Sequence, residues 1–203
     1  MKSLSYDAVI LPDEKLSEQA ILASQRLASL GGTYTLEFDR FFPHISLFML
    51  QLKDKDIDTA ISLLNGIANK LDSLNLKSSK FTQSYTYFDV GYERNIQIDS
   101  LQQQVIAKLN PIRDGVHDKY KVRMLEATGL ELENFQNYGY KYIGELFRPH
   151  ITLTRFNETQ ASAESLLPEL KTFDGSFTKL GLFEVGDSGT CVRKIVELDL
   201  SCA

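Results

Sequence analysis

One short motif occurs twice in this chain, and it restricts the fold more than any other feature. Residues 42–50 read FPHISLFML and residues 148–156 read RPHITLTRF. Both copies run Pro-His-Ile, then Ser or Thr, then Leu, although the 203 residues include only three histidines. A short apolar run of this kind is typical of a β-strand with at least one buried face. We therefore expect two equivalent strands, each carrying a histidine and a hydroxyl.

The alternation of side chains along a strand separates each motif into two faces. In the first copy His44 and Ser46 share one face, and the aliphatic residues beside them share the other. In the second copy His150 and Thr152 share a face in the same way. If the two strands face each other, two imidazoles and two hydroxyls converge on one cleft.

Apolar periodicity and turn residues predict a similar order of elements around both motifs. Around the first motif we expect a strand at 6–12, a helix at 13–32, the motif strand at 43–52, a helix at 54–74, a hairpin at 77–100 with its turn near Gly91, and a helix at 99–110. Around the second we expect the motif strand at 148–156, a helix at 158–173, and a hairpin at 177–200 with its turn at GDSG, residues 186–189. Residues 112–142 show only helical fragments broken by glycines.

The unit of strand, helix and hairpin thus occurs twice. Strands mixed with helices and joined by long hairpins predict an α+β fold. We expect two pseudo-symmetric lobes, each an antiparallel sheet with flanking helices, around a central cleft. Residues 1–203 are expected to form this single bilobal domain.

Charge and composition limit the kinds of molecule that this chain is expected to bind. The formal net charge is -5, whereas a protein that follows a long nucleic-acid backbone usually carries a basic excess. We therefore expect a small substrate or a nucleic-acid end in a local pocket, and no stable long nucleic-acid partner. No apolar run approaches the roughly 20 residues needed to span a bilayer, no signal peptide is evident, and two cysteines make no disulfide framework. These features predict a cytoplasmic protein without a membrane partner, and they leave its oligomeric state open.

The two histidines and two hydroxyls suit the chemistry of a phosphodiester. Hydroxyls can donate to the non-bridging phosphate oxygens. A neutral histidine can accept a proton from the attacking group while a protonated one gives a proton to the departing oxygen. A single histidine before such a strand is more often structural, but its duplication in matching contexts favours function. A metal site fits less well, because neither motif strand offers an Asp or Glu near its histidine. We predict no metal and no cofactor.

The duplicated motif resembles that of the 2H phosphoesterases, which include the 2′-5′ RNA ligase-like proteins and cyclic phosphodiesterases. Their signature is a duplicated His-x-Ser/Thr-x motif, and HISL and HITL match both copies. The resemblance implies that His44 and His150 are the catalytic acid/base pair. It also implies that Ser46 and Thr152 hold the phosphate. Arg155, in the continuation HITLTR, is assigned to substrate binding, although strand alternation places it on the face opposite His150.

Two other features bear on the substrate. Compared with small members of that family, the segment at about 112–147 is long, so we predict an insertion that caps or reshapes the cleft. Tyrosines alternate in NYGYKY, residues 137–142. Aromatic rings can stack on a base, so Tyr140 and Tyr142 are predicted to bind substrate, with plain packing as the alternative. His117, the third histidine, is predicted to be a solvated residue.

These patterns and the resemblance predict a metal-independent phosphodiesterase. It would open 2′,3′-cyclic phosphates of nucleotides or RNA ends, with reversible 2′-5′ RNA ligase activity as a further expectation. Two alternatives stay open. The first is a nucleotide-binding module without turnover. The second is a phosphodiesterase that acts on 2′-5′ oligonucleotides or on another small cyclic phosphate.

Overall fold

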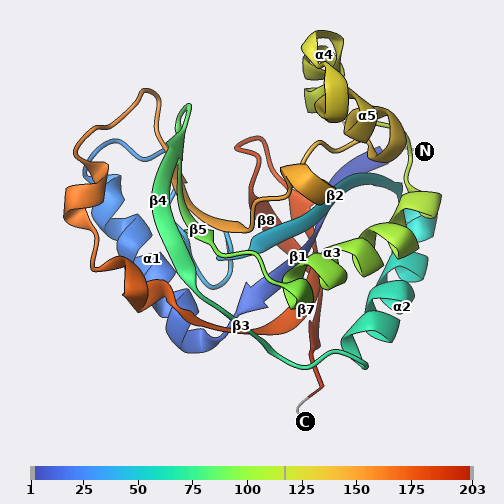
Figure 1. Cartoon of the computed structure of the whole chain (residues 1–203), viewed down its shortest axis with the longest axis horizontal. Helices are drawn as coiled ribbons and strands as arrows, with labels where there is room; N and C mark the ends of the chain where they lie inside the picture. The colour runs from blue at the N-terminus through green and yellow to red at the C-terminus, as the bar shows by residue number, and fades with distance from the viewer. Residues whose placement is uncertain (1–2, 117, 202–203) are drawn as a thin grey trace.

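The computed structural model describes residues 3–116 and 118–201, and Figure 1 shows how their strands and helices are arranged. The strands are β1 (Ser3–Pro12), β2 (Ile45–Lys53), β3 (Leu74–Leu76), β4 (Ser78–Ser84), β5 (Tyr87–Tyr92), β6 (His150–Arg155), β7 (Gly175–Val185) and β8 (Cys191–Asp199). The α-helices are α1 (Glu14–Ala28), α2 (Ile57–Ala68), α3 (Ile96–Leu109), α4 (Asp118–Glu126) and α5 (Gly129–Tyr138). Short 3₁₀ helices link several of these elements.

The described strands form two sheets. The larger has five strands, in the order β2-β1-β7-β3 with β8 beside β7, and the smaller has the order β4-β5-β6. Every pairing between these strands is antiparallel. The first motif runs into β2 and the second forms β6, so the motifs lie in different sheets. The predicted α+β fold with two antiparallel sheets and flanking helices is confirmed.

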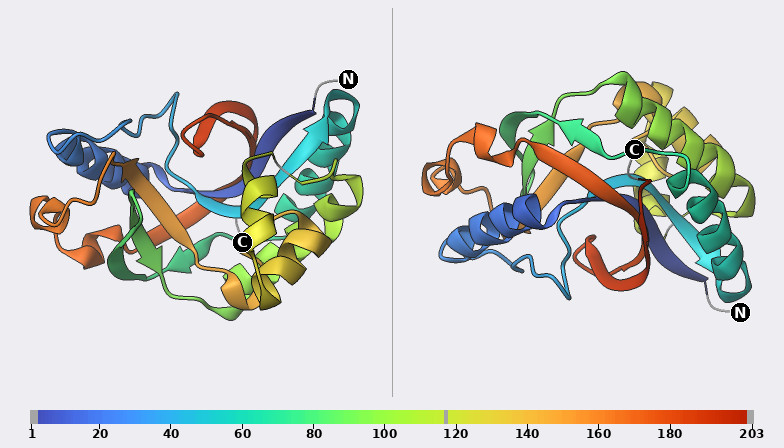
Figure 2. Two further views of the ribbon diagram at one scale, coloured as in Figure 1. Left: turned by 90° about the horizontal axis from the view of Figure 1, so that it is seen from above. Right: turned by 90° about the horizontal axis from the view of Figure 1, so that it is seen from below.

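Each sheet takes strands from both halves of the chain. The hairpin β4–β5 follows the first motif but pairs with β6, the second motif strand. The hairpin β7–β8 follows the second motif but pairs with β1, next to β2. Helix α1 lies against the smaller sheet, while α2 and α3 lie against the larger one (Figures 1 and 2). Because the halves exchange hairpins, neither sheet is completed by half of the sequence.

The motif strands bury their aliphatic faces completely. Ile45 and Leu47 of β2, and Ile151 and Leu153 of β6, are all 0 % exposed. Burying four such side chains removes a large apolar area from water, at roughly 25 cal/mol for each Å². This burial fixes the register of both strands, because a slip of one residue would turn the histidine and hydroxyl into the core.

Helices α4 and α5 form a projecting arm beside the larger sheet (Figure 1). An aromatic series anchors the arm: the Tyr120 ring centroid lies 5.6 Å from that of Phe135 and 6.0 Å from that of Tyr140. The Tyr140 ring in turn lies 6.4 Å from Phe48 of β2. The buried Asn134 amide donates to two backbone carbonyls of the segment that follows α5. The predicted insertion at about 112–147 therefore packs on the first motif strand.

The predicted helix at 158–173 is wrong. Two short 3₁₀ helices, Ala163–Leu166 and Leu170–Phe173, occupy this segment. Pro168 explains the break, because proline lacks an N–H and disfavours helical backbone at the residue before it. Leu167 accordingly has the extended dihedrals φ -94 and ψ 155.

The predicted position of the first hairpin turn is also wrong. The chain turns between β4 and β5 at Tyr85 and Thr86, where Tyr85 has a φ of 56°. Gly91 lies inside β5 instead, opposite Lys80 and His150. A Cβ at this position would lie 3.1 Å from the Ser79 hydroxyl, so glycine serves here for close packing between strands. The turn of the second hairpin lies at residues 186–189, as predicted.

Two helix ends also differ from the prediction. Helix α1 ends at Ala28 and α2 ends at Ala68, several residues before the predicted limits. The short strand β3 follows α2. The sequence did not predict this strand, which lies between the predicted helix at 54–74 and the predicted hairpin at 77–100. Of the helices in residues 3–116 and 118–201, none combines the length and apolarity required to cross a membrane.

Candidate active site

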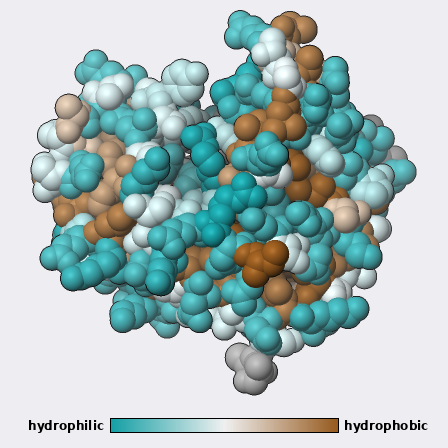
Figure 3. Space-filling model, viewed as in Figure 1, coloured by the Kyte–Doolittle hydropathy of each residue, from teal (hydrophilic) through white to brown (hydrophobic). Residues whose placement is uncertain are grey.

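A cavity of about 350 Å³ opens between the two sheets. Its lining includes both motif histidines and both motif hydroxyls: Ser46 of β2 and His44 just before it on one side, His150 and Thr152 of β6 on the other. Figure 3 shows a hollow in this face of the molecule, between the lobe of α1 and the α4–α5 arm, with hydrophilic side chains along it. The structure thus brings together the four residues that the sequence assigned to catalysis.

Both histidines are oriented by the same local device. Nδ1 of His44 lies 2.6 Å from the carbonyl oxygen of Phe42, and Nδ1 of His150 lies 2.6 Å from that of Arg148. A carbonyl oxygen can only accept a hydrogen bond, so Nδ1 carries the proton in each ring. Nε2 is therefore the atom that gains or loses a proton, on both sides of the cavity.

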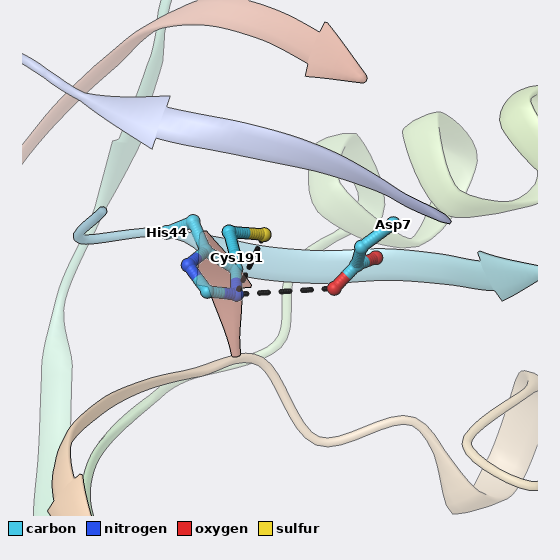
Figure 4. A group of neighbouring side chains, drawn as sticks. All are labelled: Asp7, His44 and Cys191. Atoms are coloured by element: carbon cyan, nitrogen blue, oxygen red, sulfur yellow. Dashed lines mark hydrogen bonds and ion pairs between the residues drawn. The ribbon is translucent and has the colours of Figure 1, made fainter. Parts of the chain in front are cut away.

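The two imidazoles differ in their surroundings. His44 is only 8 % exposed, and burial lowers its pKa to about 4, with a smaller contribution from the charge of His150. Its Nε2 atom lies 3.6 Å from Sγ of Cys191 and 3.8 Å from Oδ2 of Asp7 (Figure 4). His150 is half-buried at the start of β6. At neutral pH His44 is therefore held in its neutral form.

Each motif hydroxyl has a buried aspartate behind it. The Ser46 hydroxyl donates to Oδ2 of Asp7 on β1 at 2.5 Å. Burial raises the pKa of Asp7 to about 7, while the hydrogen bond from Ser46 acts in the opposite direction. Asp89 of β5 stands opposite Thr152 in the sheet register. Burial raises the pKa of Asp89 as well, against the charge of His150 and a hydrogen bond from Thr152.

Sequence reasoning missed both aspartates, because neither lies on a motif strand. Neither carboxylate is near a motif histidine in the sequence, and the pairing of β1 with β2 and of β5 with β6 brings them there. A signal was present: each is a single acid inside an apolar strand, in YDAVIL at 6–11 and YFDVGY at 87–92. Among the described residues, Asp7, His44 and Cys191 form a group whose ligand atoms all lie within 4.8 Å of one another and could hold a metal ion.

The cavity wall is basic, although the chain as a whole is acidic. Its described lining residues include five cations: Lys80, Arg94, Arg123, Lys141 and Arg148. Asp89 is the single carboxylate among them. Three of the cations also form ion pairs with carboxylates that do not line the cavity. A wall with this charge attracts an anion such as a phosphate group.

The two predicted substrate-binding tyrosines both line the cavity, in a loop and not on a strand. Tyr140 is 3 % exposed and is held by its ring contacts with the α4–α5 arm. Tyr142 is half-buried, with the Lys141 Nζ atom 4.5 Å and the Arg148 guanidinium 5.4 Å from its ring centroid. Tyr142 is therefore the more accessible ring, and two of the five cations lie beside it.

The structure does not bring Arg155 into the lining of the cavity. Its Nε donates to the Thr86 hydroxyl at 3.2 Å, and its guanidinium lies 5.2 Å from the ring centroid of Tyr87. Arg155 thus contacts Tyr87, a residue that lines the cavity, but is not part of the lining itself. Its predicted role in substrate binding stays a prediction. His117 lies outside the described residues.

Comparison with known proteins agrees with this architecture. Residues 48–183 match the family described as "Protein of unknown function (DUF1045)". The chain belongs to the DUF1045 family. The matched segment includes the second motif and begins just after the first. No curated protein matches this DUF1045 member.

Solved structures show the same fold. E. coli LigT in complex with phosphate has a TM-score of 0.59 and 12 % identity, covering 99 % of each chain. E. coli LigT in complex with 3′-AMP has a TM-score of 0.60 and 13 % identity, over 98 % of this chain and 99 % of that one. The protein TT0787 of Thermus thermophilus has a TM-score of 0.60 and 14 % identity, over 100 % and 99 %. The chain therefore shares the fold of LigT and TT0787, and the predicted two-lobe α+β architecture is confirmed.

Proposed function

We propose that this DUF1045 protein is a phosphodiesterase that opens 2′,3′-cyclic phosphates of nucleotides or RNA ends without a catalytic metal. One observation carries the proposal. Both motif histidines and both motif hydroxyls line a single basic cavity. In each histidine Nδ1 is hydrogen-bonded to a backbone carbonyl, which leaves Nε2 for the reaction. A histidine pair can supply the base and the acid of an in-line transfer at phosphorus, and hydroxyl donors can hold the phosphate oxygens.

His44 is the general base in this mechanism. Burial lowers its pKa to about 4, so the ring is neutral near pH 7 and its Nε2 can accept a proton. Nε2 takes a proton from the attacking water as the water oxygen forms a new bond to phosphorus. If a 5′-hydroxyl attacks in place of water and the bond from phosphorus to the 3′ oxygen breaks, the product is a 2′-5′ linkage.

His150 is the general acid. It is half-buried, and its positive charge faces the Asp89 carboxyl, whose pKa it lowers against the effect of burial. As the bond from phosphorus to one ribose oxygen breaks, Nε2 of His150 gives its proton to that oxygen. The products are a phosphate monoester and a free hydroxyl. The resemblance to the 2′-5′ RNA ligase-like proteins favours the 2′-phosphate product.

Ser46 and Thr152 hold the phosphate oxygens in this scheme. While Ser46 donates its single proton to Asp7, it cannot donate to a phosphate. A protonated Asp7 would instead donate to the Ser46 oxygen and free that proton for the substrate. The same holds for Asp89 and Thr152. We therefore expect both aspartic acids to be neutral when substrate is bound, the form that burial favours.

The size of the cavity and the similar structures support a small substrate. About 350 Å³ is within the usual range for small-molecule sites. E. coli LigT has been solved with phosphate and with 3′-AMP. Tyr142 offers an accessible ring on which a base can stack, beside cations suited to phosphate.

The test is hydrolysis of a panel of 2′,3′-cyclic nucleotides with EDTA present, for the wild type, His44→Ala and His150→Ala. His117→Ala is the matched control, since His117 is the one histidine outside the motifs. We expect wild-type and control turnover in EDTA, and a loss of about 10²- to 10⁴-fold in either motif variant. Full activity in one motif variant would refute the paired mechanism.

The same panel separates the alternatives. Turnover of 2′-5′ oligonucleotides but of no cyclic nucleotide would move the assignment to that substrate. Saturable binding of nucleotides without any product would identify a binding module. In either case the cavity would keep its role and the proposed reaction would be wrong.

A further inference from the structure

Three side chains from three separate segments meet behind the cavity. Asp7 comes from β1, His44 from the residue before β2, and Cys191 from the start of β8 (Figure 4). All three are buried, and the Cys191 thiol is free. The acid/base mechanism uses Nε2 of His44 but gives no task to the thiol.

The two distances from Nε2 of His44 to its neighbours are close to those of a tetrahedral metal site. Zn²⁺ binds sulfur at about 2.3 Å and imidazole nitrogen or carboxylate oxygen at about 2.0–2.1 Å. Tetrahedral angles then place the nitrogen about 3.5 Å from the sulfur and about 3.4 Å from the oxygen. The Nε2–Sγ distance here is 3.6 Å and the Nε2–Oδ2 distance is 3.8 Å. Shifts of a few tenths of an ångström would bring these two distances to tetrahedral values, and the sulfur lies within 4.8 Å of the carboxylate oxygen.

The ligands are already oriented. The bond from Nδ1 of His44 to the Phe42 carbonyl leaves the lone pair of Nε2 directed at the cluster, as in metal-bound histidines. Ser46 holds Oδ2 of Asp7 in the same way. The other oxygen of Asp7, Oδ1, is buried and has no hydrogen-bond partner. A bound cation would compensate this carboxylate, which is otherwise costly to bury.

A hydrogen bond from the Cys191 thiol to Nε2 of His44 is the simpler explanation of their contact. That bond would account for the sulfur and the nitrogen, but it supplies no positive charge to the buried carboxyl group of Asp7. A dication bound by one carboxylate and one thiolate is neutral overall, so its burial avoids an uncompensated charge. His44 and Thr190 line the cavity, which gives the ion a route in and a water a place as fourth ligand.

We propose that Asp7, His44 and Cys191 bind one Zn²⁺ ion, and that the bound ion inhibits the enzyme by occupying Nε2 of His44. The thiol proton is released when the ion binds. The thiolate selects Zn²⁺ over Mg²⁺ or Ca²⁺, which favour oxygen ligands. Binding stands by itself, whereas the inhibition rests on the proposed function.

Binding is measured first, on the full chain stripped of metal. Zn²⁺ is titrated against a chromophoric chelator, and Co²⁺ serves as a spectroscopic probe. We expect one ion per chain and a thiolate-to-cobalt charge-transfer band. Cys191→Ser should lose the band and weaken Zn²⁺ binding at least tenfold, while Cys202→Ser, the matched control at the other cysteine, should retain both. Asp7→Asn is the second variant and should also bind at least tenfold more weakly.

Inhibition is then measured with the cyclic-nucleotide assay. One equivalent of Zn²⁺ should reduce wild-type turnover more than tenfold, EDTA should restore it, and Cys191→Ser should be insensitive relative to its own rate. No stoichiometric ion in the wild type, or equal affinity in Cys191→Ser, would overturn the site even if cyclic phosphates are hydrolysed. One tightly bound ion in a chain without any turnover would instead refute the proposed function and leave the site standing.

Discussion

The two halves of the cavity carry the same motif in different surroundings. On one side His44 is buried beside Asp7 and Cys191, and on the other His150 is half-buried beside Asp89. Both imidazoles keep the Nδ1 contact to a carbonyl. The motif therefore fixes the tautomer of both rings, whereas burial by the neighbouring strands favours the neutral form of His44.

The neighbouring strands explain this asymmetry. The C-terminal hairpin brings Cys191 onto Nε2 of His44 and closes that half of the site. On the other side Gly91 stands opposite His150 in the sheet, so β5 offers no side chain there. A duplicated motif can thus yield one buried, neutral imidazole and one open imidazole, which is the difference that a base and an acid need.

The largest expected effect tests that division of roles. We compare His150→Ala and His44→Ala on a cyclic nucleotide and on a phosphodiester with a nitrophenyl leaving group. Both variants should lose about 10²- to 10⁴-fold on the cyclic nucleotide. On the nitrophenyl ester His150→Ala should recover most of its activity, because a nitrophenolate leaves without a proton. His44→Ala should recover little.

The measurement is kcat/KM for each pair of enzyme and substrate. Recovery in His44→Ala and not in His150→Ala would reverse the assignment of acid and base. Equal recovery in both would mean that the asymmetry of the site does not divide their roles.

The second expected effect is a loss of kcat when a motif hydroxyl is removed. Ser46 and Thr152 both line the cavity, and each is hydrogen-bonded to a buried aspartate. Ser46→Ala and Thr152→Val should each reduce kcat by about 10²-fold, the size seen when one oxyanion donor is removed. Thr152→Ser should stay close to the wild type, because it keeps the O–H. Thr154→Val is the matched control: this threonine is buried and donates to the Tyr34 carbonyl, and it does not line the cavity.

The control should lose stability, on the order of 1 kcal/mol for its hydrogen bond, and little activity. The assay is kcat for all four variants, together with urea denaturation. If Thr154→Val lost as much kcat as Thr152→Val, the effect would arise from the strand and not from the phosphate.

Sequence reasoning reached the fold and the two motifs because both depend on local patterns. Alternation along β2 and β6 predicts which side chains share a face, and the structure places His44 with Ser46 and His150 with Thr152 in one cavity. It did not reach Asp7, Asp89 or Cys191. Their places depend on which strands pair, and the exchange of hairpins between the halves is a long-range property that no local window contains.

The errors in secondary structure have a similar origin. Gly91 predicts a turn in the sequence because glycine is common in turns, but inside β5 it also gives room to the Ser79 hydroxyl, which would lie 3.1 Å from a Cβ. Pro168 lies near the end of the predicted helix at 158–173, and it separates two short 3₁₀ helices, Ala163–Leu166 and Leu170–Phe173. The roles of Arg155 and of the tyrosines stay predictions.

The smallest effect is on stability, and it compares two aspartates whose shifts have opposite signs. The pKa of Asp89 is raised by burial, whereas hydrogen bonds from Ser78 lower the pKa of Asp174. Folded Asp89 keeps its proton at a pH where the unfolded chain has lost it. Its carboxyl therefore reduces the free energy of unfolding as the pH rises from about 4 through the folded pKa, by about 1.4 kcal/mol for each pKa unit.

Asp89→Asn removes this penalty, so its stability relative to the wild type should increase as the pH rises from 4 to 8. Asp174→Asn should show the opposite trend in a lower window: its stability relative to the wild type should decrease as the pH rises from below the folded pKa of Asp174 to about 5. The lowered pKa of Asp174 contributes stability above the unfolded pKa, which is lost as the pH falls through the folded one. Urea denaturation midpoints at several pH values measure both.

A constant difference between Asp89→Asn and the wild type would mean that Asp89 is ionised as readily in the folded protein as in the unfolded chain. The hydroxyl of Thr152 would then face a permanent carboxylate, and the proposed release of its proton to the substrate would be wrong.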